Sequence, residues 1–273
     1  MAATTQWIMD IMEAWAPAEW AAETDNVGLL VGDRARPVVR VLTALDLSEE
    51  VLREALRGRF DFIITHHPLI SRHSQPINSI TTDNALGKKI MTLIANGIGL
   101  FSAHTNLDAA PGGVNDLLFN LLGLIEKDAL VPAEDSSFPT LGLIGYLPQP
   151  MTLENMAKHI RDVLSSDAVR YVGLPERMIH KVGICGGNGT SSLLVKAAFE
   201  KKCDVYITGD VGYHLAMEAL ESDMAVIDAT HYATEIPIAQ VIAEHIKKSA
   251  ENHGFELTVQ AAQSSRQVFK TLS

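Results

Sequence analysis

The feature that most constrains the fold is one series of strands and helices that occurs twice along the 273-residue chain. Apolar, β-branched runs of strand length alternate with stretches of helical periodicity, which is typical of α/β proteins. The first series begins at residues 37–42 and the second at residues 180–184. We therefore expect two related α/β halves, each with a sheet that helices cover on both faces.

Two short motifs support an internal duplication. Asp61-x-Ile-Ile-Thr65 matches Asp204-x-x-Ile-Thr208, and His104-x-x-x-Asp108 matches His231-x-x-x-Glu235. The order of the elements is preserved while the loops differ in length. The alternative is a chance recurrence, because every α/β protein repeats strands and helices. The predicted strands are 37–42, 61–65, 98–102, 140–147, 169–172, 180–184, 204–208, 224–227 and 256–260.

An acidic stretch at residues 126–137 lies between the two series and is the expected boundary. The first half is predicted to span residues 1–125, joined by the C-terminal segment 238–273. The second half is predicted to span residues 126–237.

Composition excludes several classes of protein. No window has enough consecutive apolar residues to span a bilayer. The two cysteines, Cys185 and Cys203, fit a reducing compartment, so we expect a cytoplasmic protein. A net charge of −11 disfavours direct binding of nucleic acid. It leaves a small phosphorylated substrate open, since a metal ion supplies positive charge locally.

Histidines and carboxylates follow the predicted strands. Ligand sites in open α/β sheets gather at the carboxyl ends of strands, so these side chains are expected to meet. Imidazole and carboxylate without thiolate favour zinc, manganese, iron or cobalt. The sequence therefore predicts a metal site. Its candidate residues are His66, His67, His104, Asp108, His231 and Glu235.

The adjacent histidines indicate two ions. Neighbouring side chains in an extended segment point to opposite sides, so His66 and His67 are awkward ligands for a single ion. Each is predicted to serve one ion of a pair, with a carboxylate such as Glu235 as the bridge. Two alternatives stay open: ordinary hydrogen-bonded histidines, and i,i+4 helix contacts within the His-x-x-x-Asp and His-x-x-x-Glu pairs.

A glycine-rich turn follows the strand at residues 180–184. Backbone N–H groups of Gly186, Gly187 and Gly189 are candidates for a phosphate cradle at a helix N-terminus. The turn lacks the lysine of a P-loop, and the alternative is a tight strand-to-helix connection capped by Ser or Thr.

The loop of the second series that corresponds to His66-His67 contains Asp210 and His214. These residues are predicted to support the metal ligands or to handle a proton. The alternative is that His214 only begins its helix.

Four segments together resemble the signatures of one family: residues 25–32, 64–69, 102–108 and 231–235. It is the Nif-three-like family of dinuclear-metal hexameric proteins, often labelled GTP cyclohydrolase 1 type 2. The resemblance spans nearly the whole chain, which has the length of the short form without an inserted middle domain.

The resemblance implies a Nif-three-like fold of two duplicated, intertwined α/β halves, with mixed sheets flanked by helices. It also implies a toroidal homohexamer and two divalent metal ions per chain, which are zinc, manganese or iron. His66 and His231 would hold one ion, His67 and Asp108 the other, and Glu235 would bridge them. His104 matches a family histidine that is near the site but not among the usual ligands.

The function expected from this site is metal-dependent hydrolysis of a nucleotide or another phosphorylated metabolite, similar to a GTP cyclohydrolase. His104 or His214 would transfer the proton. The alternative is a hexameric metal-handling or regulatory protein without turnover.

Overall fold

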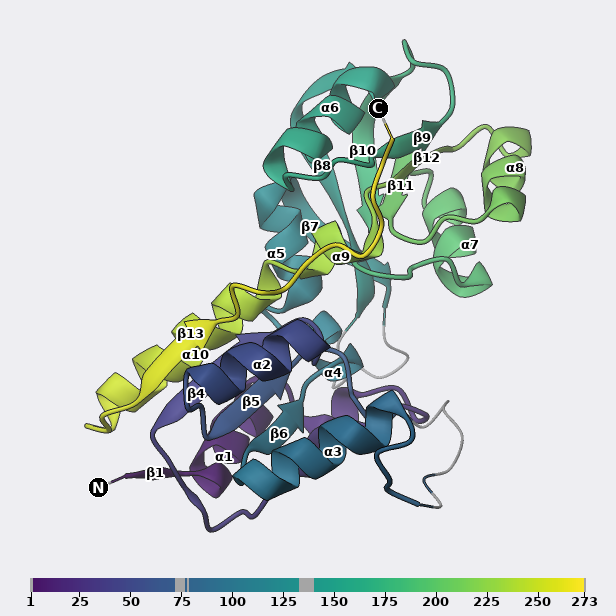
Figure 1. The fold of residues 1–273 in the computed structure, drawn as a ribbon. Helices are drawn as coiled ribbons and strands as arrows, with labels where there is room; N and C mark the ends of the chain where they lie inside the picture. Colours follow the sequence, from purple (N-terminus) through teal and green to yellow (C-terminus); the bar gives the residue numbers. More distant parts are fainter. Residues whose placement is uncertain (1, 72–76, 78, 133–139, 273) are drawn as a thin grey trace. The chain divides into compact units, whose positions relative to one another are not determined.

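The computed structural model describes residues 2–71, 77, 79–132 and 140–272. The chain forms two compact units (Figure 1). The first comprises Met1–Leu107 and Ile238–Arg266, and the second comprises Asp108–Pro237 and Gln267–Ser273. Both contain a mixed sheet flanked by helices, so the predicted α/β architecture is confirmed.

The sheet of the first unit has five strands. Their order is β13 (Thr258–Ala261), β4 (Arg40–Ala44), β5 (Phe62–Thr65), β6 (Gly99–Ser102) and β2 (Gly28–Val31). The first four are parallel, and β2 is antiparallel to β6. The predicted C-terminal strand thus pairs with β4. A small antiparallel pair, β1 (Ala3–Thr4) with β3 (Pro37–Val38), stands apart from this sheet.

Helices cover both faces of the first sheet. On one face α2 (Glu49–Arg57) and α3 (Ala85–Asn96) share a core with β5 through Leu52, Leu93 and Ile63. On the other face α10 (Ile238–Asn252) lies against β4, where Thr43 Oγ1 donates to Ala239 O at 2.6 Å. Helix α1 (Thr5–Trp15) packs on α10 and is followed by the short turn η1 (Ala18–Trp20). The predicted end of α3 is confirmed by Gly97, which is left-handed at φ 61°.

The sheet of the second unit has six strands. Their order is β7 (Ile125–Val131), β8 (Leu141–Thr152), β10 (Met178–Ile184), β11 (Val205–Thr208), β12 (Ala225–Asp228) and β9 (Arg170–Val172). The strands β10, β11 and β12 are parallel, and the other three pair antiparallel with their neighbours.

Helices also cover both faces of the second sheet. One face packs against α5 (Val114–Leu121) and α6 (Leu153–Val163), which contribute Leu118 and Met156 to the core. The other face packs against α7 (Ser192–Glu200) and α8 (Tyr213–Glu221), with Tyr206 and Val226 buried beneath them. The short helices α4 (Thr105–Ala109) and α9 (His231–Glu235) follow the ends of β6 and β12.

The predicted boundary after residue 125 is wrong. Residues 108–125, including Asp108, belong to the second unit, because Leu118 and Phe119 of α5 pack into the second core. Part of the acidic stretch forms β7, and its residues 133–137 lie outside the described residues. The C-terminal segment is divided as well: residues 238–266 join the first unit and residues 267–273 group with the second.

The repeated aspartate motif makes the same hydrogen bonds in both units. Asp61, just before β5, accepts the N–H groups of Val39 and Arg40 at 2.8 Å each. Asp204, just before β11, accepts those of residues 180 and 181 at 2.9 and 2.7 Å. Each carboxylate thus holds the preceding parallel strand in register. This shared role favours duplication over chance recurrence.

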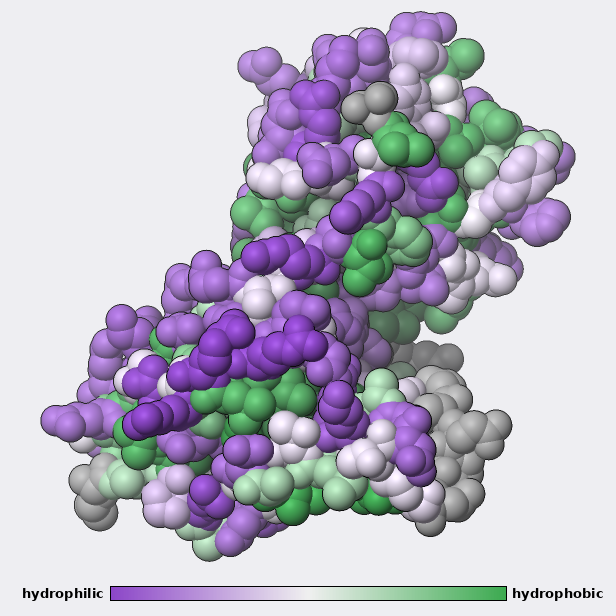
Figure 2. Space-filling view, in the orientation of Figure 1, coloured by the Kyte–Doolittle hydropathy of each residue, from purple (hydrophilic) through white to green (hydrophobic). Residues whose placement is uncertain are grey.

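The surface of both units is mixed. On the face drawn in Figure 2, hydrophilic residues predominate and hydrophobic ones form small scattered patches. Among the described residues, none of the helices combines the length and the apolar character that crossing a membrane requires.

Replacing either register-holding aspartate should destabilise its unit. We expect Asp61→Ala or Asp204→Ala to lower the free energy of unfolding by about 1–3 kcal/mol, because two N–H groups lose a charged acceptor. Urea denaturation measures this change. The control is Asp223→Ala, whose side chain is 96% exposed in a surface ion pair with Arg177, and its effect should stay below about 1 kcal/mol. Equal effects in all three variants would contradict the proposed role.

Candidate metal centre

The first group of candidate ligands lies at the carboxyl end of β5. His66 and His67 follow this buried strand directly, and their N–H groups donate to Ala44 O and Leu45 O at 3.1 and 2.9 Å. The pairing with the neighbouring chain therefore continues beyond β5 and fixes both backbones. His66 is fully buried, whereas His67 is only partly covered.

His104, which follows β6, completes a cluster of three imidazoles. The histidine cluster, His66, His67 and His104, places one ring nitrogen of each within 4.8 Å of the others. The ring centroids lie 5.0 to 5.5 Å apart. These distances leave room for a cation among the three rings.

The prediction that His66 and His67 point apart is wrong. It assumed an extended backbone, but β5 ends at Thr65 and the chain bends at both histidines. Both rings therefore face His104. The two residues are as well placed to share one ion as to serve two.

Each histidine of the cluster makes a similar hydrogen bond through Nδ1. The acceptors are Ala103 O for His66 (2.9 Å), Asp46 Oδ1 for His67 (2.8 Å) and Asp25 Oδ2 for His104 (2.9 Å). A carbonyl or an ionised carboxylate can only accept, so Nδ1 carries the proton in each ring. In a neutral ring Nε2 then keeps its lone pair, as in histidines that ligate metals.

The second group of candidate ligands occupies α9 in the second unit. His231 and Glu235 are its first and last residues, and His231 Nε2 lies 2.9 Å from Glu235 Oε2. This is the i,i+4 contact that the sequence left open. His231 Nδ1 lies 2.8 Å from Asp210 Oδ2, so Asp210 orients this ring as predicted for a supporting residue. Glu235 is only 3% exposed.

A strained residue sets the start of α9. Thr230 has φ 68° and ψ 145°, which a β-branched residue seldom adopts. The N–H of Thr230 donates to Asp228 Oδ1 at 3.0 Å, and Thr230 Oγ1 accepts the N–H of Ala233 at 3.2 Å. These bonds hold the turn that directs His231 and Glu235. Strain of this kind is common at functional sites.

The glycine-rich turn lies against Glu235. A Cβ on Gly187, where φ is +60°, would stand 1.9 Å from Glu235 Oε1, so only glycine fits there. The N–H groups of Gly186, Gly187 and Gly189 donate to side chains of this unit. The acceptors are Asn115 Oδ1, Thr234 Oγ1 and Thr208 Oγ1, at 2.9, 2.9 and 2.8 Å.

These hydrogen bonds favour the alternative of a packed strand-to-helix connection. A phosphate cradle needs the same N–H groups for the anion, and here the protein uses them. Ser191 caps α7 through its side chain, as that alternative requires. The turn brings the backbone of Gly187 close to the Glu235 carboxylate.

Asp108 and Glu235 both act on Cys185. Burial raises the pKa of the Cys185 thiol to about 12, and the negative charges of Asp108 and Glu235 add to this shift. The two carboxylates therefore lie near the same thiol within the second unit. Cys185 therefore stays protonated at neutral pH, which makes its thiol a poor nucleophile.

His214 is exposed at the start of α8. Its ring packs edge-on against Tyr213, with 5.7 Å between the centroids. Among the contacts of the described residues, none links His214 to His231 or Glu235. The structure thus supports the simpler interpretation that His214 only begins its helix.

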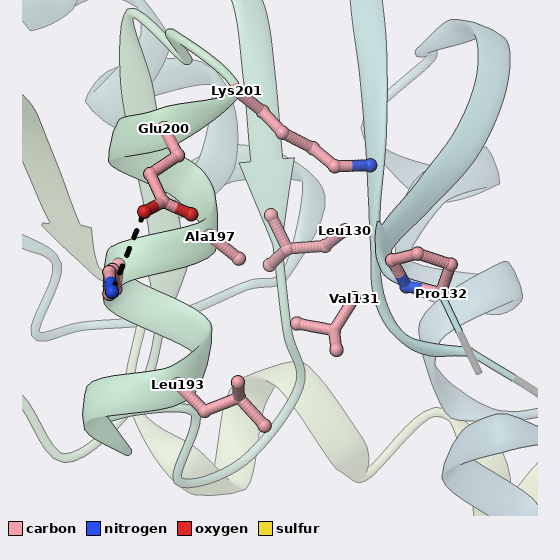
Figure 3. A pocket seen from close by; sticks show the side chains of 8 residues that line it. Leu130, Val131, Pro132, Leu193, Ala197, Glu200 and Lys201 are labelled. Atoms are coloured by element: carbon pink, nitrogen blue, oxygen red, sulfur yellow. Dashed lines mark ion pairs between the residues drawn. The ribbon is translucent and has the colours of Figure 1, made fainter. Parts of the chain in front are cut away.

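A separate shallow pocket lies between α7 and the end of β7 (Figure 3). Its volume is about 280 Å³, and aliphatic side chains such as Leu130, Val131 and Leu193 line it beside the ion pair of Lys196 with Glu200. None of its lining residues is a candidate ligand, so it has no part in the metal site.

The donor set fits a divalent cation. Imidazole nitrogens and carboxylates, of which Glu235 is nearly buried, suit zinc, manganese or iron in the absence of thiolate. Fold and donors together define a mixed α/β protein with histidine and carboxylate clusters that suit metal ions.

The chain belongs to the family described as Duf34/NIF3 (NGG1p interacting factor 3), whose model matches residues 3–267. A relative from Clostridium acetobutylicum named "GTP cyclohydrolase 1 type 2 homolog" is 33% identical over 265 residues, which cover 96% of this chain and 97% of the relative. A relative of the same name from Clostridium perfringens is 35% identical over 245 residues, covering 90% and 92%. The predicted resemblance is therefore confirmed.

A solved structure agrees with this assignment. The Bacillus cereus protein related to NIF3 superposes with a TM-score of 0.91 at 26% identity, over 100% of both chains. The Nif-three-like fold is thus shown over the full length.

Gly187→Ala should displace Glu235, because the new Cβ would collide with its carboxylate and the backbone conformation would be strained. If Glu235 is a ligand, zinc affinity should fall by about tenfold or more, as isothermal titration would measure. Gly212→Ala is the matched control, since a Cβ there has open space. Unchanged zinc binding in Gly187→Ala would show that this position of Glu235 is not needed.

Proposed function

We propose that this protein binds two divalent metal ions and hydrolyses a nucleotide or another small phosphorylated metabolite. The observation that carries the proposal is the histidine cluster, in which an oxygen accepts a hydrogen bond from Nδ1 of each ring and one ring nitrogen of each histidine lies within 4.8 Å of the others. His231 makes a fourth hydrogen bond of this kind, from Nδ1 to Asp210 Oδ2. Ordinary surface histidines have no reason to share this arrangement.

The ligand assignment follows the family resemblance. His66 and His231 would hold one ion, His67 and Asp108 would hold the other, and Glu235 would bridge the pair. Ions held by these residues would supply Lewis-acid chemistry, which lowers the pKa of a water molecule and polarises a substrate oxygen. Zinc, manganese and iron all suit these donors.

The protein's own groups supply the remaining chemistry. His104 presents Nε2 beside the two histidine ligands, so it is the residue placed to accept or return a proton. His214 is the weaker candidate because of its exposure. The relatives' names refer to GTP cyclohydrolase, which supports a nucleotide as the substrate class. The resemblance also supports a cytoplasmic homohexamer as the working form.

Metal content tests the ligand set. Protein purified without added metal or a metal-binding tag should contain about two ions per chain by elemental analysis. Glu235→Ala should lose at least one of them, because both ions would share this carboxylate. The exposed Glu244→Ala serves as the control and should keep both. Trace metal in the wild type, even after soaking in zinc, manganese or iron, would refute the proposal.

Metal removal tests the reaction. A panel of nucleotides that includes GTP should show hydrolysis that chelation abolishes and that the restored metal recovers. His104→Ala should lower kcat by about 100-fold while the metal content is retained. A protein that binds two ions but turns over no member of the panel would support the non-catalytic, metal-handling alternative.

A further inference from the structure

Asp25 is a nearly buried carboxylate at the edge of the histidine cluster. Its side chain is only 7% exposed, and it precedes β2 in the sequence. Asp25 Oδ2 accepts hydrogen bonds from His104 Nδ1 at 2.9 Å, Thr105 N at 3.1 Å and Thr105 Oγ1 at 2.6 Å. Its other oxygen, Oδ1, accepts the N–H of Asn26 at 2.8 Å.

We propose that Asp25 is a positioning residue that holds His104 in one tautomer, with Nδ1 protonated and the Nε2 lone pair directed toward His66 and His67. The inference rests on the proposed function, in which His104 accepts a proton through Nε2. Asp25 acts through the imidazole that it holds.

The ionisation of Asp25 supports this role. Burial alone would raise the pKa of this carboxyl, but the hydrogen bonds from His104 and Thr105 outweigh it and hold the pKa well below the usual range. The carboxylate therefore stays ionised at any pH near neutrality and can only accept. Nδ1 of His104 must then be the donor, which excludes the opposite tautomer.

The geometry also fixes the direction of the ring. His104 is 29% exposed, so contacts alone would leave it room to turn. Asp25 prevents this by binding the ring nitrogen and the following residue, Thr105, with the same oxygen. The ring consequently stays edge-on to His66 and His67, with interplanar angles of 71° and 82°.

The internal repeat supplies an independent comparison. His231 occupies the position of the second half that corresponds to His104, and its Nδ1 is also held by a carboxylate, Asp210. The two carboxylates come from unrelated places, one before β2 and the other after β11. A bond that both halves make with different partners is a requirement of the site and not a by-product of packing.

The test reads the tautomer of His104 in the zinc-loaded protein, by two-bond proton–nitrogen NMR spectra assigned with His104→Gln. The wild type should show Nδ1–H alone. Asp25→Ala should show a mixture of tautomers, and Asp25→Asn, which keeps an accepting oxygen, should lie between them. If a substrate has been found, kcat of Asp25→Ala should fall about 10- to 100-fold with little change in KM.

Thr105→Val is the matched control. It removes the hydroxyl bond to Asp25 and the bond from Ala22 N to Thr105 Oγ1, but leaves the bond between Asp25 and His104. It should keep the wild-type tautomer. The proposal is overturned if His104 keeps its tautomer in Asp25→Ala, or if Thr105→Val disturbs it equally. Because the spectra need no substrate, they still decide whether Asp25 fixes the tautomer of His104 if the proposed reaction is not found.

Discussion

The hydrogen bond from a histidine Nδ1 to an oxygen that can only accept is the interaction on which the site depends. An imidazole that is buried without a partner would lose the free energy of its hydration. His66 is fully buried, and the carbonyl of Ala103 offsets that cost while it also selects the tautomer. The bond at Nδ1 therefore contributes at each ring to packing, to the position of the proton and to the direction of the other nitrogen.

The parallel sheets place these bonds where they are needed. In the first unit, Thr65 at the end of β5 bonds to Ser102 Oγ and His67 O at 2.8 Å each. In the second, Thr208 at the end of β11 bonds to Gly187 O at 3.2 Å and accepts the N–H of Gly189. Each buried threonine thus ties its strand end to the chain that leads into the site. Since the aspartates at the other ends of these strands fix the register, both ends of the repeat motif have a physical function.

Much of this fold follows from local patterns. The strands are short, buried and rich in β-branched residues, and the helices carry recognisable caps such as Ser48 for α2 and Asn84 for α3. Patterns of this kind do not reveal which sheet a helix covers, and so the boundary was misplaced: α5 follows the first sheet in sequence but packs on the second. The strand β7 was missed because its exposed residues are largely charged or polar.

The candidate ligands were predictable because each follows a strand, but their relative directions were not. An alternating strand predicts that His66 and His67 diverge, and the bend after Thr65 overrides that rule. The residues that orient the rings were also hidden, since Asp25 and Asp46 are distant in sequence from the histidines they hold. Asp210 is as far from His231 in sequence as Asp46 is from His67, and it was predicted as a supporting residue from its place in the repeat.

The two halves hold corresponding histidines in the same way, but with carboxylates from different places in the chain. His104 and His231 correspond in the repeat, and both rings are held through Nδ1 by a carboxylate, yet the carboxylates do not correspond. The acidic members of the repeated motif differ as well: Glu235 is long enough to reach back to His231 Nε2 within α9, and Gly187 makes room for its carboxylate. Asp108, one methylene shorter, has a different environment beside Asn115, which donates to its carbonyl. The two halves thus share an imidazole that a carboxylate holds through Nδ1, while the acidic group of the repeated motif differs. That combination gives the two halves different candidate ligands on the same framework.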